Sequence, residues 1–309
     1  MLRNAIKRFV GVLSVIPEQY RKSGKITSEV KGLVRAAVKP GMEFLEICSL
    51  VKDQVESRGG QLAFPTGIGV NEVTAHYAPQ DGDASVIQEE DLVKVDFGVH
   101  VDGYVTDTSV TVTFNPGYNL LLEATERCLE VAINAARKES RTAEIGREIH
   151  REAARFGFKT IENLTGHTVD RYVVHAGKSI PNLYMPGMQS LKQGDVFAIE
   201  PFLTLGSAAG YVVDTPSKTI FSLVARKRTG TQELDSFAEK VWIERKTLPF
   251  TPQWYSSEYP GKKLQDILAR LVAKKVVRAY PTLVEASGSP VAQFEHTMAL
   301  DEGGLTVLT

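Results

Sequence analysis

The sequence is poor in several residue types that mark particular classes of protein. Among its 309 residues there are only two cysteines, Cys48 and Cys128, too few for a disulfide framework or a thiolate metal site. Both stand among apolar residues in helix-like segments, so we expect them to be buried and reduced, as in the cytoplasm. A formal net charge of -1 supplies no overall field that would attract nucleic acid or an anionic membrane.

Long apolar runs are missing as well. No segment approaches the roughly 20 apolar residues that span a bilayer, so we expect no membrane partner. The apolar residues 9–16 follow Arg3, Lys7 and Arg8, as in a signal peptide, but no small-residue cleavage site accompanies them. We therefore interpret residues 1–23 as a basic amphipathic leader and the protein as cytoplasmic.

The remaining composition is that of an ordinary globular protein, with 43% apolar and 24% charged residues. Apolar residues follow helical and then strand spacing in an order that occurs twice: two helices, then strands. This order predicts an α+β fold of two similar halves. The predicted helices cover residues 28–38 (with Ser28 as N-cap), 43–58, 120–136 and 144–156, and the predicted strands cover 92–98, 104–114, 196–202, the surroundings of 211–213, and 291–300.

Residues 223–286 interrupt the second half. They hold 12 Lys/Arg and 7 Asp/Glu, a net charge of +5, and a helical pattern at residues 263–275. We interpret this segment as a helical insertion with a basic surface. Such a surface is usually a solvated face, and docking to a charged partner is the alternative.

Two aspartates stand inside a predicted β-hairpin, where Asp is rare. A two-residue turn at residues 102–103 places Asp96 opposite Ser109. The same register places Gly98 opposite Asp107, so that the two aspartates are diagonal neighbours on one face. Adjacent carboxylates repel unless a proton or cation lies between them. The alternative is that both point into solvent.

Two glutamates also lie in strand-like segments. Glu200 follows the apolar residues 196–199, and Glu295 lies among the β-prone residues 291–298. Because a lone buried carboxylate is costly, two in core-like strands indicate a common counter-charge.

Histidine is scarce, with six residues in the chain. Three lie in loop or strand contexts and are candidates for ligands or catalysis, although each alone is more often structural: His76, His167 and His175. We interpret the other three as structural: His100, His150 and His296. Four carboxylates and one imidazole together suit two divalent metal ions of the Mn, Fe, Co or Zn type. A pair of such ions activates water for hydrolysis.

The order of these residues resembles a known ligand set. Asp96, Asp107, His167, Glu200 and Glu295, separated by 11, 60, 33 and 95 residues, are similar to the five metal ligands of methionine aminopeptidases. The sequences around these residues also resemble those of the family: AFPTG at 63–67, AHY at 75–77, KVDFG at 94–98, AIEP at 198–201 and AQFEHT at 292–297. The resemblance runs from about residue 24 to the end. It implies the pita-bread fold for 24–309, and the insertion and short leader resemble archaeal type 2 members.

This resemblance also implies roles for individual residues. Asp107 and Glu295 would bridge two divalent metal ions (Co, Mn, Fe or Zn), Asp96 would complete one ion, and His167 and Glu200 the other. Glu200 would relay the proton in catalysis. The non-ligand imidazoles His76 and His175 would hold the scissile amide and stabilise the oxyanion. Phe64, Tyr280 and Leu283 match positions that line the pocket for the methionine side chain.

The resemblance thus implies an enzyme that removes the initiator methionine from nascent polypeptides when the second residue is small. The sequence itself indicates no oligomeric state, and we take a monomer as the default. Two alternatives remain. One is a hydrolase for Xaa-Pro bonds, such as a prolidase or aminopeptidase P, with the same fold and metals. The other is a non-catalytic pita-bread protein associated with the ribosome or RNA. The basic charge of the leader and of the insertion favours this alternative.

Overall fold

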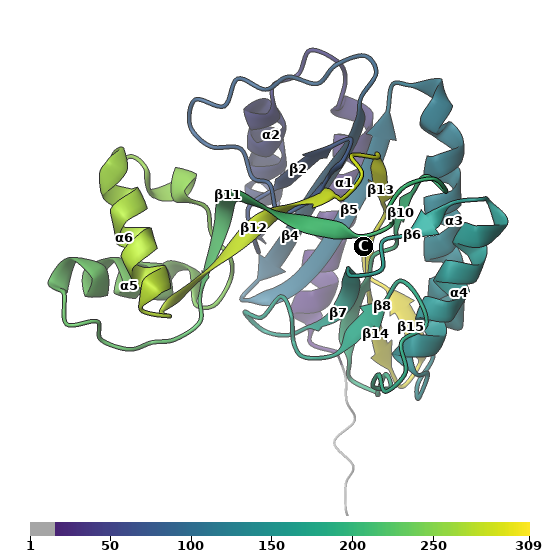
Figure 1. Ribbon diagram of the computed structural model, residues 1–309. Coiled ribbons are helices and arrows are strands. Elements are labelled where there is room, and N and C mark those ends of the chain that lie inside the picture. Colours follow the sequence, from purple (N-terminus) through teal and green to yellow (C-terminus); the bar gives the residue numbers. More distant parts are fainter. Residues whose placement is uncertain (1–15) are drawn as a thin grey trace, which may run out of the picture.

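The computed structural model describes residues 16–309 (Figure 1). The predicted leader falls mainly on residues 1–15, which lie outside the described part. Its last residues, 18–23, form the start of the first helix, α1 (Glu18–Ala37). Within residues 16–309, no helix combines the length and apolar character needed to cross a bilayer.

Helix α1 begins ten residues before the predicted start at Ser28. The local sequence does not predict this extension, because Gly24 is a poor helix former. Gly24 is nevertheless required inside α1, since a Cβ there would lie 2.5 Å from the carbonyl oxygen of Leu308. The glycine thus lets the C-terminal segment pack directly on the helix.

The first half of the molecule is built around one long hairpin. Strand β4 (Leu92–Val101) pairs with β5 (Tyr104–Thr113) through the predicted turn, and β1 (Gln61–Leu62) and β2 (Gly67–Val70) pair with β4. Helix α1 and helix α2 (Phe44–Glu56) bury their apolar faces in the same core as the hairpin, where Val30, Val34 and Ile47 are fully buried. The predicted helix at residues 43–58 and the predicted hairpin are therefore confirmed, the helix to within two residues at each end.

The second half repeats the theme of two helices and a sheet. Helices α3 (Asn119–Ala135) and α4 (Thr142–Arg155) are confirmed within two residues of their predicted ends. The five-stranded sheet has the order β15-β14-β9-β7-β8. Its strands are β7 (Thr165–Val169), β8 (Ser179–Pro181), β9 (Val196–Ile199), β14 (His296–Asp301) and β15 (Gly304–Val307). A smaller sheet contains β6 (Lys159–Thr160), β10 (Phe202–Thr204) and β13 (Val291–Gln293).

Two strands that the sequence predicts as continuous are each broken in two. The segment 196–202 is interrupted at residues 200–201 between β9 and β10, and the segment 291–300 at residues 294–295 between β13 and β14. Pro201 has no N–H to donate to a ladder, which explains the first break. At the second break, the Glu295 N–H donates instead to the carbonyl of Ser109, at 3.2 Å. Glu200 and Glu295 both stand at these breaks.

A two-stranded ribbon links the body to a separate lobe, at the left of Figure 1. Strand β11 (Val212–Leu223), longer than predicted, pairs with β12 (Val277–Glu285), and β12 pairs with β3 (Val73–Ala75). The lobe contains α5 (Gln232–Arg245), the 3-10 turn η2 (Pro252–Tyr255) and α6 (Lys262–Ala273); a second such turn, η1 (Pro116–Tyr118), precedes α3.

The lobe has an apolar core of its own, with Phe237, Leu268 and Leu271 among its buried residues. Helix α5 was not predicted; its buried residues Leu234, Phe237 and Val241 form a stripe, but the exposed Ile243 lies outside it and weakens the apolar pattern. The last part of the predicted helical insertion, residues 277–285, is strand β12 and not helix.

Candidate dinuclear metal site and its cavity

The five predicted ligands come from both halves of the molecule and line one cavity. Asp96 lies on β4, Asp107 on β5 and His167 on β7, while Glu200 and Glu295 stand at the two strand breaks. All five line a cavity of about 390 Å³. The structure therefore brings together every residue of the predicted ligand set.

The hairpin register explains why both aspartates face the cavity. Asp96 pairs with Ser109 and Gly98 with Asp107, as the two-residue turn predicts. The backbone around Asp107 is further fixed by Thr297, whose hydroxyl accepts the Asp107 N–H at 2.7 Å and donates to the Asp107 carbonyl at 2.8 Å. Because Thr297 is two residues after Glu295, this contact fixes the second strand break against β5.

The side chains converge without satisfying one another. His167 Nε2 lies 3.6 Å from Asp107 Oδ2 and 3.6 Å from Glu200 Oε1, too far for good hydrogen bonds. Ligand atoms of Asp107, His167 and Glu295 all lie within 4.8 Å of one another. Three buried carboxylate oxygens, Asp96 Oδ1, Asp107 Oδ1 and Glu295 Oε1, have no hydrogen-bond partner among residues 16–309.

Unpartnered buried carboxylate oxygens around one imidazole fit divalent cations, because a cation would satisfy them all. Burial, followed by repulsion from Asp96, raises the pKa of Asp107 well above its usual range. Burial and the Asp107 charge likewise raise the pKa values of Glu200 and Glu295. Burial and His175 lower the pKa of His167, so its ring is neutral and able to donate a lone pair to a metal.

The two remaining predicted histidines also line the cavity. The ring of His175 lies 4.1 Å from that of His167, and burial lowers its pKa to about 4. His76 has a left-handed backbone, with φ +63°, which is costly for a residue with a Cβ. The hydroxyls of Thr219 and Thr282 each donate to its carbonyl at 3.3 Å and hold this conformation.

Apolar and aromatic residues form the other wall of the cavity. Phe64 and Tyr280 line it as predicted. Leu283 is not among the lining residues; it is buried in a small apolar cluster with Phe202 and Val291, behind the wall. Sequence reasoning missed several other lining residues: Asn163, Leu164, Thr165, Val174, Phe202, Ile220, Pro249 and Arg278. It also missed Gln293, whose side-chain amide donates to Glu200 Oε2 at 3.1 Å, although Gln293 stands in the AQFEHT string.

Comparison with known proteins identifies the family. Residues 18–249 match the sequence profile of metallopeptidase family M24. The methionine aminopeptidase of Pyrococcus horikoshii is 40% identical over 289 residues, which cover 93% of this chain and 97% of that protein. The methionine aminopeptidase of Methanothermobacter thermautotrophicus is 37% identical over 295 residues, with 94% and 98% covered. The chain belongs to the methionine aminopeptidases of family M24.

Solved structures agree with this assignment at the level of the fold. A thermophilic Arx1 has a TM-score of 0.82 at 19% identity, covering 94% of this chain and 90% of that one. The methionine aminopeptidase of Thermotoga maritima has a TM-score of 0.68 at 23% identity, covering 96% and 98%. The predicted α+β pita-bread fold is confirmed, as is the prediction of a metal-dependent peptide hydrolase.

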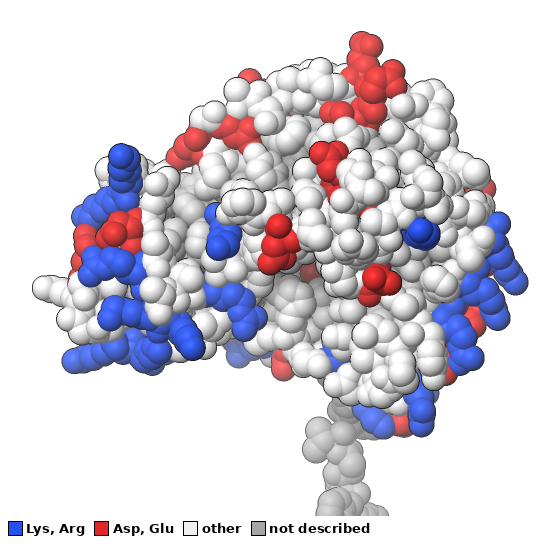
Figure 2. Space-filling model, viewed as in Figure 1, with Lys and Arg blue, Asp and Glu red and all other residues white. Residues whose placement is uncertain are grey.

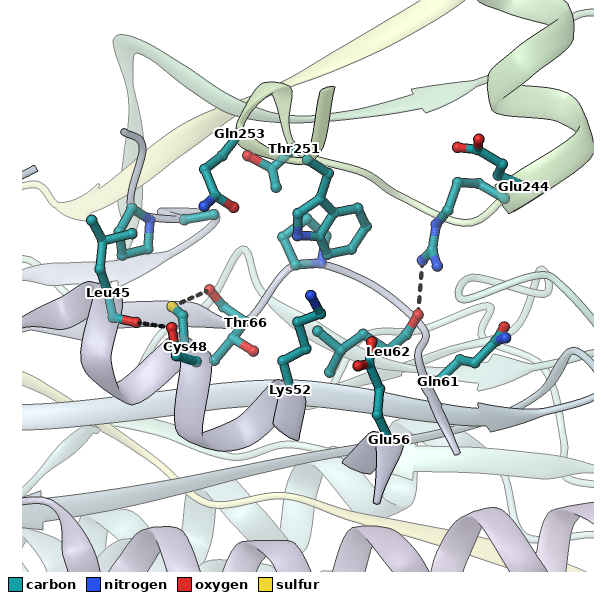
Figure 3. A pocket seen from close by; sticks show the side chains of 16 residues that line it. Leu45, Cys48, Lys52, Glu56, Gln61, Leu62, Thr66, Glu244, Thr251 and Gln253 are labelled. Carbon is teal, nitrogen blue, oxygen red and sulfur yellow. Dashed lines mark hydrogen bonds between the residues drawn. The ribbon is translucent and has the colours of Figure 1, made fainter. Parts of the chain in front are cut away.

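The protein has a second, larger cavity of about 670 Å³ between α2 and the lobe. Figure 3 shows Lys52 and Glu56 on its α2 side and Glu244 on its α5 side. It holds no cluster of buried carboxylates around a histidine, so size alone does not identify the catalytic cavity. The two cavities share the loop of residues 62–66, because Phe64 lines one and Thr66 the other.

One buried guanidinium ties this shared loop to the lobe. Arg245 Nη2 donates to the carbonyl oxygens of Leu62 (2.8 Å, the dashed line at Leu62 in Figure 3), Ala63 (3.0 Å) and Pro249 (3.2 Å). The same guanidinium lies over the ring of Trp254, with 4.8 Å to the centroid. Arg245 therefore fixes the backbone on either side of the apolar wall.

Proposed function

We propose that this cavity removes the N-terminal methionine from newly made proteins and peptides by hydrolysis of the first peptide bond. The observation that carries the proposal is the juxtaposition of the carboxylate–histidine cluster with an apolar, aromatic wall in one cavity. The free α-amino group would bind to the metal ions that the carboxylate–histidine cluster would hold, and an aromatic wall suits a polarisable thioether. We also propose that the second residue must be small.

The proposed cofactor is a pair of divalent metal ions, drawn from Co, Mn, Fe and Zn. Asp107 and Glu295 would be shared by both ions, with Asp96 on one and His167 and Glu200 on the other. When bound, such ions lower the pKa of water and polarise the substrate carbonyl. The neutral ring of His167 and the unpartnered oxygens of Asp107 and Glu295 support this assignment.

We assign the remaining steps to side chains of the chain itself. Glu200 would accept the proton of the attacking water and pass it to the leaving amine. His76 Nδ1 lies 3.3 Å from the carbonyl of Pro281, which makes Nδ1 the donor and leaves Nε2 as an acceptor for the scissile N–H. His175 would stabilise the developing oxyanion. Phe64, Tyr280 and, behind them, Leu283 would hold the methionine side chain.

The test is peptide cleavage by metal-stripped full-length protein with Mn, Co or Zn added back. We expect free methionine from Met-Ala-Ser only with metal, and a loss of about 10²-fold or more in kcat for His76→Ala. His150→Gln, on α4 and outside the cavity, is the matched control and should retain activity. Cleavage of Xaa-Pro peptides alone would favour the prolidase alternative, and no cleavage with any metal would favour the non-catalytic one.

We further propose a single catalytic domain at residues 24–309 that contains the insertion 223–286, preceded by the leader 1–23. The enzyme would act as a monomer in the cytoplasm. The free cysteines Cys48 and Cys128 support a reducing compartment. Light scattering after size exclusion tests the monomer, and a mass equal to two chains would contradict it.

Ribosome association is a second proposal, carried by the charge of the lobe. Lys and Arg gather over α5 and α6, at the left of Figure 2. Several are neutralised by ion pairs, such as Arg226 with Glu239 and Lys263 with Glu233. Lys227 and Lys262 form none with residues 16–309. We expect co-sedimentation with ribosomes at low salt that is lost at high salt; salt-independent binding would contradict the electrostatic basis.

A further inference from the structure

One side chain at the cavity carries a charge that the proposed reaction does not use. Arg278 lies on β12, two residues before Tyr280, and both line the cavity. Two residues along a strand return to the same face. The register confirms this placement, because Arg278 pairs with Ser222 and Tyr280 with Ile220, and Ser222 Oγ lies 3.0 Å from the Tyr280 hydroxyl. Arg278 and Tyr280 therefore share the face of the ribbon that looks into the cavity.

Arg278 stands at the open edge of this face. Arg278 is exposed, whereas Tyr280 is partly buried and Ile220 is buried. It is the one Lys or Arg among the residues that line the cavity, and no ion pair of residues 16–309 includes it. A guanidinium group in this position is free to pair with a group that enters the mouth of the cavity.

The direction of the substrate decides which group that is. In the proposed function, on which this inference rests, the α-amino group of methionine lies at the carboxylate cluster, so the rest of the peptide leaves through the mouth. An extended chain advances about 3.3–3.6 Å per residue, so each residue after the second lies nearer to the rim at which Arg278 stands. Guanidinium groups recognise carboxylates with two parallel hydrogen bonds.

We propose that Arg278 forms a subsite for a carboxylate on the substrate immediately after its second residue. The carboxylate can come from an acidic side chain at position three or from the C-terminus of a tripeptide. The subsite selects among substrates and takes no part in bond cleavage. Because the pair forms at a solvent-accessible rim, its effect on kcat/KM is a few-fold and falls with added salt.

The experiment compares kcat/KM for Met-Ala-Asp-Gly, Met-Ala-Gln-Gly and Met-Ala-Lys-Gly, all with amidated C-termini, using the metal-loaded enzyme at low salt. We expect the order Asp, Gln, Lys, with about 3- to 10-fold between the first and last. Arg278→Gln should bring the three values together, and Arg278→Glu should reverse the order. A second arm compares Met-Ala-Ser as free acid and amide, which separates a terminal carboxylate from a side-chain one.

Lys227→Ala is the matched control, because Lys227 is an exposed cation of the lobe that is not among the residues lining the catalytic cavity. It should preserve the wild-type order of the three peptides. Equal cleavage of all three by the wild type, or an order that survives Arg278→Gln, would overturn the subsite while leaving the proposed function intact. Absence of methionine release from every peptide would instead overturn the proposed function.

Discussion

The ring of Phe64 lies so close to Gly98 that a Cβ on the glycine would come within 2.3 Å of Phe64 Cε1. Gly98 also pairs with Asp107 across the hairpin. The absence of a side chain at Gly98 therefore lets Phe64, in the apolar wall, pack next to the strand pair that carries a predicted metal ligand. The wall of the cavity thus depends on the hairpin as much as on its own loop.

Replacing this glycine should damage the substrate pocket. Gly98→Ala would displace the Phe64 ring, and we expect a loss of about 1–3 kcal/mol in the free energy of unfolding together with a raised KM for Met-Ala-Ser. Urea unfolding and steady-state kinetics measure the two effects. Gly32→Ala, in the interior of α1, is the control, because no atom of the described residues lies within 4 Å of its added Cβ. That variant should be slightly more stable than wild type, and equal effects of both changes would contradict the argument.

The carboxylate cluster should destabilise the protein when it holds no metal. Asp107→Asn removes one of four mutually repelling groups, so the metal-stripped variant should unfold at higher urea concentration than metal-stripped wild type. Wild type should gain about 2.7 kcal/mol at a metal concentration 100 times its Kd, and the variant much less. Activity should fall by at least about 10²-fold. An unchanged metal response in Asp107→Asn would remove Asp107 from the ligand set.

The buried guanidinium of Arg245 should matter for selectivity as well as stability. Arg245→Lys keeps the charge but loses the planar group that lies over Trp254, and its shorter side chain does not bring the ammonium to the position from which Nη2 donates to the three carbonyl oxygens. We expect a loss of about 1.5–3 kcal/mol in unfolding free energy and a smaller kcat/KM preference for methionine over norleucine or leucine at position one. Arg226→Ala, an exposed pair partner of Glu239, should leave the preference unchanged. Lost stability with an unaltered preference would restrict Arg245 to a scaffold role.

Stability should fall in acid partly because of His100. Burial, followed by the charge of Arg245, lowers the pKa of His100 to about 4. Between about pH 6.5 and 4 the unfolded chain therefore binds one more proton at this residue, so unfolding free energy drops by about 1.4 kcal/mol per pH unit as pH falls. His100→Asn keeps an acceptor for the Gly103 N–H, which His100 Nδ1 accepts at 3.2 Å. Its stability should fall less steeply, measured by urea unfolding at several pH values; parallel slopes would show that His100 does not titrate.

Local patterns predicted the parts of the fold that obey local rules. The two-residue turn alone predicted the hairpin register, and this register places Asp96 and Asp107 on the same face. The start of α1 and the strand break at residues 294–295 did not follow, because they depend on partners distant in sequence: Leu308 for Gly24, and Ser109 for Glu295. The break at residues 200–201 was missed although Pro201 is a local signal for it. Propensity cannot anticipate such contacts.

The candidate site divides in the same way. Its charged members could be found because buried carboxylates and scarce histidines are conspicuous in a sequence. Gln293, Arg278 and Arg245 could not, since an amide or a cation in an ordinary position carries no local mark. Each gains meaning only when another segment is folded against it, as Pro249 and Leu62 are against Arg245.

The β11–β12 ribbon has two occupied faces. Ile220, Arg278 and Tyr280 look into the catalytic cavity, whereas Phe221, Leu223 and Val277 are buried in the core of the lobe. A substitution in that distant core can tilt the ribbon and so reshape the cavity without altering any residue that meets the substrate. Substrate preference in this protein can therefore be altered through the lobe, and an engineer seeking a wider or narrower specificity has a second region of the fold to mutate.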